Sequence, residues 1–346
     1  MSNQRVIVAM SGGVDSSVAA LLLKETGYEV IGVTMRLYNT EDQKLPAYYR
    51  GCCTLDDIED ARRVCNRLEV PHYVFDVQQE FQSFVIDYFC QEYQKGRTPH
   101  PCIACNDKIK FNFLAQRASF LDANYVATGH YARIDLQDDG YHLLRGVDNS
   151  KDQSYVLYGM GQEELSHTLL PVGWHDKTKI RLMAQQANFP NADKPDSQDI
   201  CFIPSGDYRK FLTERVQTKE GDLVDTLGRV LGRHKGIEFY TVGQRRGLGV
   251  TSAEPMYVLA IDAHLNQVIV GHETDLYQDI VWVSEVNYTH KQMSEPTKIT
   301  IKVRYKSPET PAVLYPEANK KARLKLEVPQ RAITPGQAVV FYQGDE

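Results

Sequence analysis

The chain has 346 residues, more than one hydrophobic core usually holds, so we expect two or three domains. Its composition, 42% hydrophobic and 24% charged residues, is that of a soluble globular protein, and no apolar run is long enough to span a membrane. The net charge of −6 disfavours a protein that coats nucleic acid by bulk positive charge, although a local basic surface can still bind RNA.

The cysteine content argues against a disulfide framework, because seven is an odd number. We expect core thiols, metal ligands or reactive sulfurs in a reducing compartment. The first five residues lead directly into a predicted strand and leave no room for a signal peptide, so we expect a cytoplasmic protein. The seven are Cys52, Cys53, Cys65, Cys90, Cys102, Cys105 and Cys201.

The first predicted elements are a strand over residues 6–10 and a helix from Val18, joined by a glycine-rich loop. Gly12 and Gly13 let the backbone approach an anion, and serine hydroxyls and unpaired amides at the helix N-terminus add donors. The loop therefore predicts a phosphate site. It lacks the lysine of a Walker A loop and the glycine spacing of a dinucleotide fold. The alternative is an ordinary turn capped by Asp15.

The same loop carries the Ser-Gly-Gly-x-Asp-Ser signature and so resembles the PP-loop ATP pyrophosphatases, which cleave ATP between the α and β phosphates and adenylate an oxygen. A second strand over 28–35 places Met35 near the loop, where it either packs on an adenine ring or belongs to the core. Further strands over 73–75 and 125–128, with helices between them, predict an α/β fold with a doubly wound parallel sheet.

Residues 39–53 are polar and aperiodic, which predicts a loop over the site. Thr54 and Asp57 have the spacing of a capping box, and the helix that follows them has one apolar face. Cys65 lies on that face and Cys90 on a similar one, so we expect both thiols to be buried and inert.

A proline-stiffened loop over residues 96–106 leads into a predicted helix over 109–121. Cys105 falls at or beside the start of this helix. There the helix dipole, with Lys108 and Lys110 close by, would lower the pKa of the thiol and favour the thiolate.

Three further segments precede residue 210. Residues 151–155 are predicted to form an exposed polar turn, and residues 177–187 a short helix. Residues 195–204 predict an acidic turn followed by a β-like apolar patch that contains Cys201, an unusual position for a thiol with only a packing role.

The C-terminal third predicts two β-rich domains. Frequent glycines between 221 and 249 separate short strands and basic residues, and alternation at period two from residue 280 suggests a small closed barrel. Its lysines and arginines either contact a phosphate backbone or form a solvated strand face. The basic residues of the first of these two β-rich domains are Arg229, Arg233, His234, Lys235, Arg245 and Arg246. The predicted domains are 1–210 (catalytic, ATP-binding), 211–279 (central, β-rich) and 280–346 (a β-barrel).

Over essentially its whole length, the sequence resembles the bacterial tRNA-uridine 2-sulfurtransferases, the tRNA-specific 2-thiouridylases of the MnmA type. The stretches that carry the resemblance are 9–17, 52–55, 96–111, 127–133, 151–155, 197–202, 243–248 and 335–337. The resemblance implies ATP and Mg²⁺ as cofactors. Its partners would be tRNA and a persulfide-carrying sulfur-donor protein, and neither a membrane nor DNA is expected.

The resemblance also implies roles for individual residues. Cys105 would be the nucleophile, and Cys201 would carry the incoming persulfide. ATP would contact Ala9, Met10, Ser11, Gly12, Gly13, Val14, Asp15, Ser16, Met35 and Gly129. The tRNA would contact His100, Pro101, Cys102, His130, Lys151, Asp152, Gln153, Arg304, Tyr305 and Gln337.

The implied reaction is thiolation of the wobble uridine. The uracil C2 oxygen attacks the α phosphate of ATP, pyrophosphate leaves, and the persulfide of Cys201 then delivers sulfur to C2 as AMP departs. Cys105 attacks the inner sulfur of the persulfide and leaves a disulfide with Cys201. Because the target base belongs to an anticodon loop, it must be unstacked and turned into the pocket.

One departure from the family pattern leaves alternatives open. Many members carry Asn-Pro-Asp where this chain has His100-Pro101-Cys102, so an aspartate proposed for proton handling is absent. Cys102, Cys105 and Cys201 could together hold an iron-sulfur cluster with one open iron. The rival functions are a PP-loop synthetase that uses an amine nucleophile, which needs neither Cys105 nor Cys201, and a non-catalytic RNA-binding adaptor.

Overall fold

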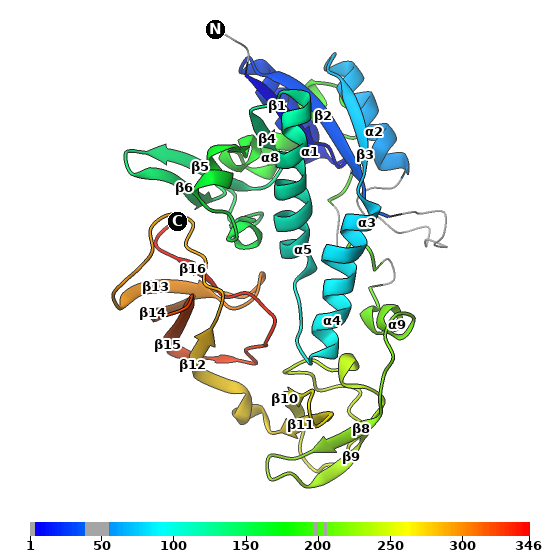
Figure 1. Cartoon of the computed structure of the whole chain (residues 1–346), viewed down its shortest axis with the longest axis vertical. Helices are drawn as coiled ribbons and strands as arrows, with labels where there is room; N and C mark the ends of the chain where they lie inside the picture. The colour runs from blue at the N-terminus through cyan, green and yellow to red at the C-terminus, as the bar shows by residue number, and fades with distance from the viewer. Residues whose placement is uncertain (1–3, 39–54, 197–199, 204–205) are drawn as a thin grey trace.

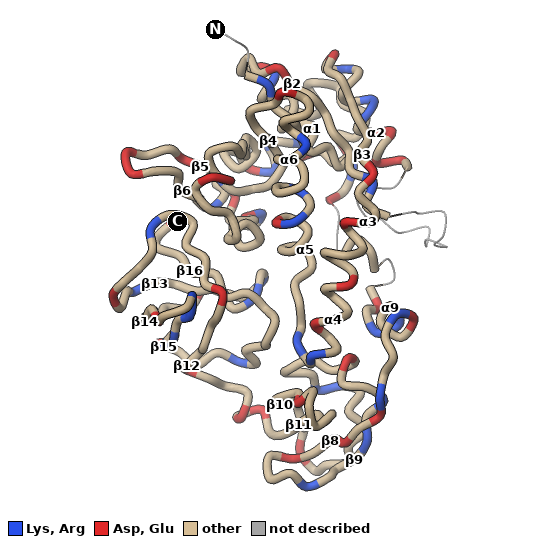
Figure 2. The backbone as a smooth tube through the Cα atoms, in the orientation of Figure 1, with Lys and Arg blue, Asp and Glu red and all other residues tan. Residues whose placement is uncertain are grey.

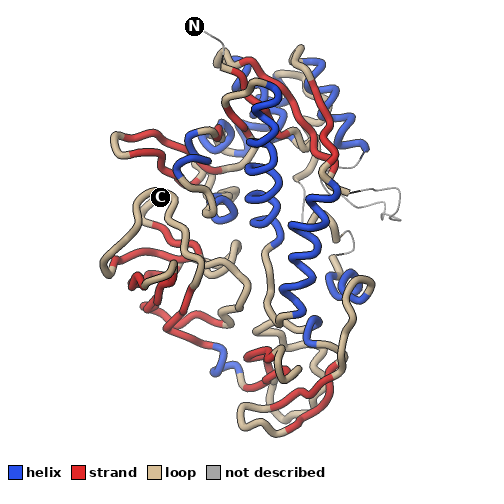
Figure 3. The backbone as a smooth tube through the Cα atoms, viewed as in Figure 1, coloured by secondary structure: helices blue, strands red, loops and turns tan. Residues whose placement is uncertain are grey.

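The computed structural model describes residues 4–38, 55–196, 200–203 and 206–346. It contains three larger β-sheets and a two-stranded hairpin. Two long helical segments run from the first sheet towards the second, and the third sheet stands beside them (Figures 1 and 3). The predicted loop over residues 39–53, with Cys52 and Cys53, and the capping residue Thr54 lie outside the described residues.

The N-terminal sheet has five parallel strands in the order β3-β2-β1-β4-β7. The order reverses between β1 and β4, and the loops after these strands meet at this switch point, where open α/β sheets bind ligands. The predicted doubly wound parallel sheet is therefore confirmed. The strands are β1 (Arg5–Ala9), β2 (Glu29–Arg36), β3 (His72–Asp76), β4 (Tyr125–Ala127) and β7 (Thr168–Leu169).

Helices cover both faces of this sheet because successive strand side chains point to opposite sides. Val6 and Val8 pack with α1, α2 and α8, whereas Ile7 packs with the two long helical segments. Cys65 and Cys90 are buried, as predicted. The helices of the first face are α1 (Val14–Glu25), α2 (Leu55–Arg67) and α8 (Lys177–Gln186).

The two long helical segments lie side by side and each contains a π-helical stretch (Figure 1). The second begins at Pro101, four residues before Cys105, the residue expected at or beside its start. Proline is favoured in the first turn of a helix, and His100 before it is extended. The first comprises α3 (Gln78–Phe81), a π-helix (Gln82–Asp87) and α4 (Tyr88–Gln94). The second comprises α5 (Pro101–Ala104), a π-helix (Cys105–Phe113), α6 (Leu114–Ala118) and a 3₁₀ turn (Ser119–Leu121).

A hairpin and several short helices connect the sheet to the C-terminal part. The prediction of an exposed turn over 151–155 is wrong, because Asp152, Ser154 and Tyr155 are buried against the C-terminal sheet. The connecting elements are β5 (Ala132–Gln137), β6 (Gly140–Arg145), α7 (Gln162–Ser166) and 3₁₀ turns at Ser154–Leu157 and Pro171–Trp174.

The second sheet has the order β10-β11-β8-β9 and its own core. The predicted basic face is only partly present: His234 is buried, and Arg229 and Arg233 pair with Asp225 and Asp222. The elements are α9 (Tyr208–Thr213), β8 (Gly221–Val224), β9 (Val230–His234), a 3₁₀ turn (Ile237–Phe239), β10 (Tyr257–Asp262) and β11 (Gln267–Gly271).

The third sheet is antiparallel, with the order β12-β15-β14-β13-β16. Its inward residues alternate along the strands, as the period of two predicted, and Ile299 and Ile301 lie in its core. The elements are a 3₁₀ turn (Glu273–Leu276), β12 (Tyr277–Val283), β13 (Thr297–Lys302), β14 (Thr310–Glu317), β15 (Lys321–Arg331) and β16 (Val340–Tyr342). Among the helices that the structure describes, none is long and apolar enough to cross a membrane.

Candidate active site

The glycine-rich loop follows β1 and ends at Gly13, the N-cap of α1. No side chain caps this helix, so the amides of its first turn are available to an anion. Gly12 has a φ of +73°, and a Cβ there would collide with the backbone of Asp57 in α2. The loop thus has the close, uncapped backbone that phosphate groups require, and its residues fit ATP.

Two residues expected to contact ATP lie at the same edge of the sheet. Gly129 follows β4, and a Cβ added there would lie 2.6 Å from the carbonyl carbon of Asp15 and from the amide nitrogen of Ser16. Met35 lies near the end of β2 and is 7% exposed within a hydrophobic cluster. The structure therefore brings Gly129 directly against the loop, and it places Met35 in the core beside it.

Asp15 takes part in a charged network that the sequence did not reveal. Lys177 Nζ donates to both carboxylate oxygens of Asp15, at 2.7 and 2.9 Å, and lies 2.8 Å from Asp196 Oδ1. Lys151 Nζ lies 2.9 Å from the other oxygen of Asp196, and Tyr131 donates its hydroxyl to Asp15 at 2.7 Å. Burial acts to raise the pKa of Asp196, but hydrogen bonds from Lys177 and Lys151 outweigh it and lower that pKa to about 2.

This network joins the phosphate loop to the segment that leads to Cys201. Lys177 is the first residue of α8 and is only 11% exposed at its side chain. In the sequence, Lys177 is only the first residue of a predicted helix, after the capping residue Asp176. No local pattern therefore identified it as a partner of Asp15. Asn191, also missed, donates to Gly12 O and Ser17 Oγ at 2.9 Å each.

Cys105 is the fifth residue of its helix and opens the π-helical stretch. It is 7% exposed and belongs to a cluster with Phe81, Phe89 and Phe202. Cys102 lies in the first turn of the same helix, nearer the positive end of the dipole, and is exposed. A lowered pKa for Cys105 stays a prediction.

Cys201 packs against the same cluster as Cys105, with part of its surface exposed. Tyr38, two residues beyond β2, donates its hydroxyl to Cys201 O at 2.9 Å. The ring of Phe202 packs on Phe81 and Phe89 with centroid separations of 5.8 and 5.4 Å. Residues 200–203 form a turn in which Ile203 N donates to Ile200 O. The prediction of a β-like patch around Cys201 is therefore wrong.

An aromatic group surrounds His100 at the start of the helix that carries both Cys102 and Cys105. The His100 ring lies 6.0 Å from that of Tyr155 and 6.1 Å from that of Tyr305, between centroids. Its buried Nδ1 has no hydrogen-bond partner among the described residues. Burial lowers the pKa of His100, so the ring is neutral at pH 7 and offers polar atoms to a neutral ligand such as a base.

His130, expected to contact tRNA, is buried with its Nδ1 2.6 Å from Thr128 Oγ1 and its ring near Phe111. Burial, with a smaller effect of Lys110, lowers its pKa well below the ordinary value. The ring is therefore neutral at pH 7 and adds no positive charge for a phosphate.

Other residues expected to contact tRNA make intramolecular hydrogen bonds. Asp152 Oδ1 accepts from Gly146 N and Ser154 N, and Gln153 Oε1 accepts from Tyr131 N. Arg304 donates to Ala332 O and Thr334 Oγ1, and Gln337 Nε2 donates to Thr98 O at 2.8 Å. Of these contacts, the one from Gln337 joins the C-terminal part to the loop that precedes Pro101.

A cleft of about 1080 Å³ separates α4 and the loop after it from the C-terminal sheet. His100 and Gln337 line it, as do the aromatic residues Tyr158, Trp282 and Tyr288. Lysine and arginine are interspersed with acidic residues over all three parts of the molecule, without one continuous basic face in this view (Figure 2).

Three family models cover the chain. Residues 4–205 match the tRNA methyl transferase HUP domain, residues 209–272 the tRNA methyl transferase PRC-barrel domain, and residues 278–346 the aminomethyltransferase beta-barrel domain. These descriptions agree with a parallel sheet followed by two β-rich units.

Curated relatives match over the full length. The chain is 49% identical over 344 residues to tRNA-specific 2-thiouridylase MnmA of Moorella thermoacetica, covering 98% of this chain and 96% of the relative. It is 47% identical over 351 residues to the protein of that name from Carboxydothermus hydrogenoformans, covering 100% and 96%. For that of Acetivibrio thermocellus the identity is 46% over 350 residues, covering 100% and 98%. The chain belongs to the family of tRNA-specific 2-thiouridylases.

Proposed function

We propose that this chain is an ATP-dependent tRNA sulfurtransferase that replaces the C2 oxygen of the wobble uridine with sulfur. The observation that supports it most is the uncapped glycine loop at the carboxyl edge of the parallel sheet, together with a cysteine segment tied to the neighbouring strand. Tyr38, two residues beyond β2, donates to Cys201 O, and Cys201 and Cys105 both pack in the hydrophobic cluster that contains Met35. We further propose 1–210 as the catalytic domain, 211–279 as the central domain and 280–346 as a tRNA-contacting domain.

In the adenylation step, the loop binds the phosphates of ATP through the amides after Gly13 and the hydroxyls of Ser11 and Ser16. Lys177 supplies from α8 the positive charge that a Walker lysine would supply from the loop itself. Mg²⁺ prefers oxygen ligands, and Asp15 is the carboxylate of the loop that would hold it; the ion would neutralise phosphate charge. The uracil C2 oxygen displaces pyrophosphate from the α phosphate.

In the sulfur-transfer step, a donor protein first leaves a persulfide on Cys201. Its terminal sulfur attacks C2 of the adenylated uracil, the C2–O bond breaks, and AMP leaves with the oxygen. Cys105, as a thiolate, then attacks the inner sulfur of Cys201, which releases the 2-thiouridine and forms a disulfide between the two cysteines. A dithiol reductant restores both thiols.

The base that reacts would be bound beside His100. The target uridine leaves its stack in the anticodon loop and packs among the rings near His100, where the buried Nδ1 offers a hydrogen bond to a neutral base. Cys102 is exposed in the first turn of the helix and lies near Tyr305, so both side chains would lie beside the bound base. The tRNA stem would then lie in the cleft against the C-terminal sheet.

Two measurements on one reaction test this function. The purified chain is incubated with unmodified tRNA, ATP, Mg²⁺ and a sulfide source, and nucleosides are identified by mass spectrometry while AMP and pyrophosphate are quantified. We expect 2-thiouridine at the wobble position with one AMP per thiolation. ATP cleavage without any thiolated nucleoside would instead support an amine-using synthetase, and no ATP cleavage a non-catalytic adaptor.

The alternative with an iron-sulfur cluster requires Cys102 as a third ligand, whereas the persulfide route requires only Cys105 and Cys201. Iron analysis and absorption spectroscopy of anaerobically purified chain separate the two. A colourless and fully active chain supports the persulfide route; a brown chain whose activity follows its iron content supports the cluster.

A further inference from the structure

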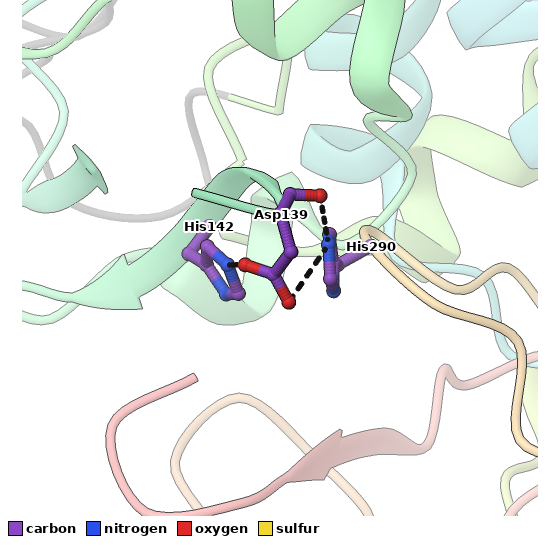
Figure 4. Close-up of side chains that lie close together, drawn as sticks. All are labelled: Asp139, His142 and His290. Atoms are coloured by element: carbon purple, nitrogen blue, oxygen red, sulfur yellow. Dashed lines mark hydrogen bonds and ion pairs between the residues drawn. The ribbon is translucent and has the colours of Figure 1, made fainter. Parts of the chain in front are cut away.

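Far from the phosphate loop, three side chains from two parts of the molecule point towards one another (Figure 4). We propose that Asp139, His142 and His290 form a binding site for a transition-metal dication of the zinc class. One ligand atom from each residue lies within 4.8 Å of the other two. Asp139 and His142 belong to the hairpin formed by β5 and β6, and His290 precedes β13 of the C-terminal sheet.

Both histidines direct the same ring nitrogen at Asp139. His142 Nε2 lies 2.9 Å from Asp139 Oδ1. His290 Nε2 lies 2.8 Å from the backbone carbonyl oxygen of Asp139 and 3.7 Å from its Oδ2. Their rings are 4.3 Å apart between centroids. Ligand bonds of about 2.0–2.2 Å in a tetrahedral zinc site place neighbouring ligand atoms roughly 3.3 Å apart. The observed separations bracket that value, so small side-chain movements suffice for coordination.

A supporting shell already holds the ligands. Glu346 Oε1 lies 3.0 Å from His142 Nδ1, the nitrogen that faces away from Asp139. A carboxylate on the far nitrogen of a histidine fixes the tautomer that presents the other nitrogen to a metal. His142 is itself buried, which limits the movement of its ring.

The backbone of the hairpin turn is also adapted to the approach of His290. Gly140 has a φ of +137°, and a Cβ there would lie 2.6 Å from Gln162 Oε1 and 3.2 Å from His290 Cδ2. Gln162 Nε2 donates to Tyr141 O at 2.7 Å and to Thr289 O at 2.8 Å, which joins the hairpin to the segment that carries His290. The ligands therefore come from distant parts of the chain but are held in one place.

The ligand set selects the class of metal. Two imidazole nitrogens and one carboxylate suit zinc, cobalt or nickel, whereas Mg²⁺ and Ca²⁺ prefer oxygen ligands. Asp139 is exposed, and His290 and Glu346 line the cleft, so an ion can enter and water can complete its coordination. A bound metal would link the hairpin to the C-terminal sheet and so fix the width of the cleft; it takes part in no reaction step.

The test uses full-length chain in which Cys102, Cys105 and Cys201 are changed to serine, so that zinc cannot bind these thiols. After equilibrium dialysis against micromolar zinc, metal is quantified by mass spectrometry. We expect one zinc per chain, lost in His290→Ala and bound at least ten-fold more weakly in Asp139→Asn. The control is His272→Ala, because His272 lies 3.1 Å from Glu254 in an exposed ion pair outside this cluster and should leave zinc binding unchanged.

Thermal unfolding with and without EDTA gives a second readout. Zinc should raise the melting temperature of the triple-serine chain and of His272→Ala, and should not change that of His290→Ala. Because Asp139→Asn keeps the shape of the side chain, its weakened binding cannot be attributed to misfolding. The proposal is overturned if the triple-serine chain binds no zinc, or if either Asp139→Asn or His290→Ala binds it as tightly as the parent; the contacts are then hydrogen bonds alone.

Discussion

Lys177 is the most important residue of the candidate site that sequence analysis did not identify. Its ammonium bridges Asp15, in the first turn of α1 directly after the phosphate loop, and Asp196, five residues before Cys201. One lysine thus connects the segment that would bind ATP with the segment that would carry sulfur. A nucleotide that binds at the loop and attracts Lys177 would change its contact with Asp196, which couples the two half-reactions.

Removal of the Lys177 charge should slow adenylation. Lys177→Met keeps most of the apolar side chain but leaves Asp15 without its cation, so we expect pyrophosphate release to fall about 100-fold or more, the usual effect of losing one electrostatic contact to a transition state. Lys179→Met is the matched control, since Lys179 lies on the same helix and is exposed. Equal rates in the two variants would contradict the role of Lys177.

Asp196 makes a pH-dependent contribution to stability. Its folded-state pKa of about 2 lies below the ordinary 3.8, so the stabilisation is present above pH 4 and is lost as pH falls through 2. After discounting for a side chain that is 32% exposed, we expect Asp196→Asn to lower the free energy of unfolding by about 1–2 kcal/mol at pH 7.

Urea denaturation of both chains at pH 7, 5, 4 and 3 checks this expectation. The difference between the wild type and Asp196→Asn should be the same at pH 7 and 5 and should shrink from pH 4 to pH 3. A difference that does not change with pH would mean that Asp196 stabilises the fold through packing and not through its charge.

At the scale of elements, the approach of the β4 loop to the N-terminus of α1 depends on Gly129. A methyl group there would lie 2.6 Å from the Asp15 backbone, so Gly129→Ala must push the loop away from the helix. We expect a rise in the KM for ATP of at least about ten-fold, since misplacement by about 1 Å is costly in a preorganised site. Gly159→Ala, where the added carbon meets no atom within 4 Å, should leave the KM unchanged.

Local sequence patterns predicted some elements correctly and others wrongly. The strand, glycine loop and helix at the N-terminus follow from residues 6–23, because periodicity and glycine spacing act over short distances. The helix start at Pro101 was missed because the proline was interpreted as part of a loop although it is favoured in a first helical turn. The burial of Ser154 and Tyr155 was missed because their partners Tyr342 and Ala338 lie more than 180 residues away.

The residues of the candidate site likewise divide into those with a local sequence pattern and those that depend on long-range contacts. The signature from Ala9 to Ser16 was visible as a motif, whereas the contacts of Lys177 and Asn191 with the loop are long-range and have no local pattern. That Cys105 and Cys201 pack in one hydrophobic cluster was likewise inaccessible to spacing arguments, because the cluster is built from residues far apart in the sequence.

At the scale of the whole molecule, the C-terminal sheet closes one side of the cleft, and the segment after β15 docks on the loop that bears His100, where Thr98 N donates to Pro335 O. Gly336 makes this contact: a Cβ there would lie 2.8 Å from Thr98 N and 3.0 Å from Arg97 Cβ. Gly336→Ala should therefore displace the sheet and raise the KM for tRNA by about ten-fold, while the KM for ATP stays within about two-fold.

Gly344→Ala is the control for this prediction. Gly344 also has a positive φ, +61° against +93° at Gly336, but no atom lies within 4 Å of its added Cβ. Gly344→Ala therefore introduces the backbone strain of a positive φ without a steric collision between the new Cβ and its neighbours. If both variants raise the KM for tRNA equally, strain near the C-terminus and not docking of the sheet explains the effect.

The central claim is that two cysteines transfer sulfur to an adenylated uridine, and trapping the intermediate tests it most directly. In Cys105→Ser, the bond between the Cys201 persulfide and C2 cannot be resolved by Cys105. With tRNA, ATP, Mg²⁺ and a persulfide donor, and without reductant, we predict a protein–tRNA adduct at Cys201 that dithiothreitol cleaves, absent in Cys201→Ser and in the absence of ATP. Thiolated tRNA formed by Cys105→Ser at the wild-type rate, with no adduct, would contradict the account.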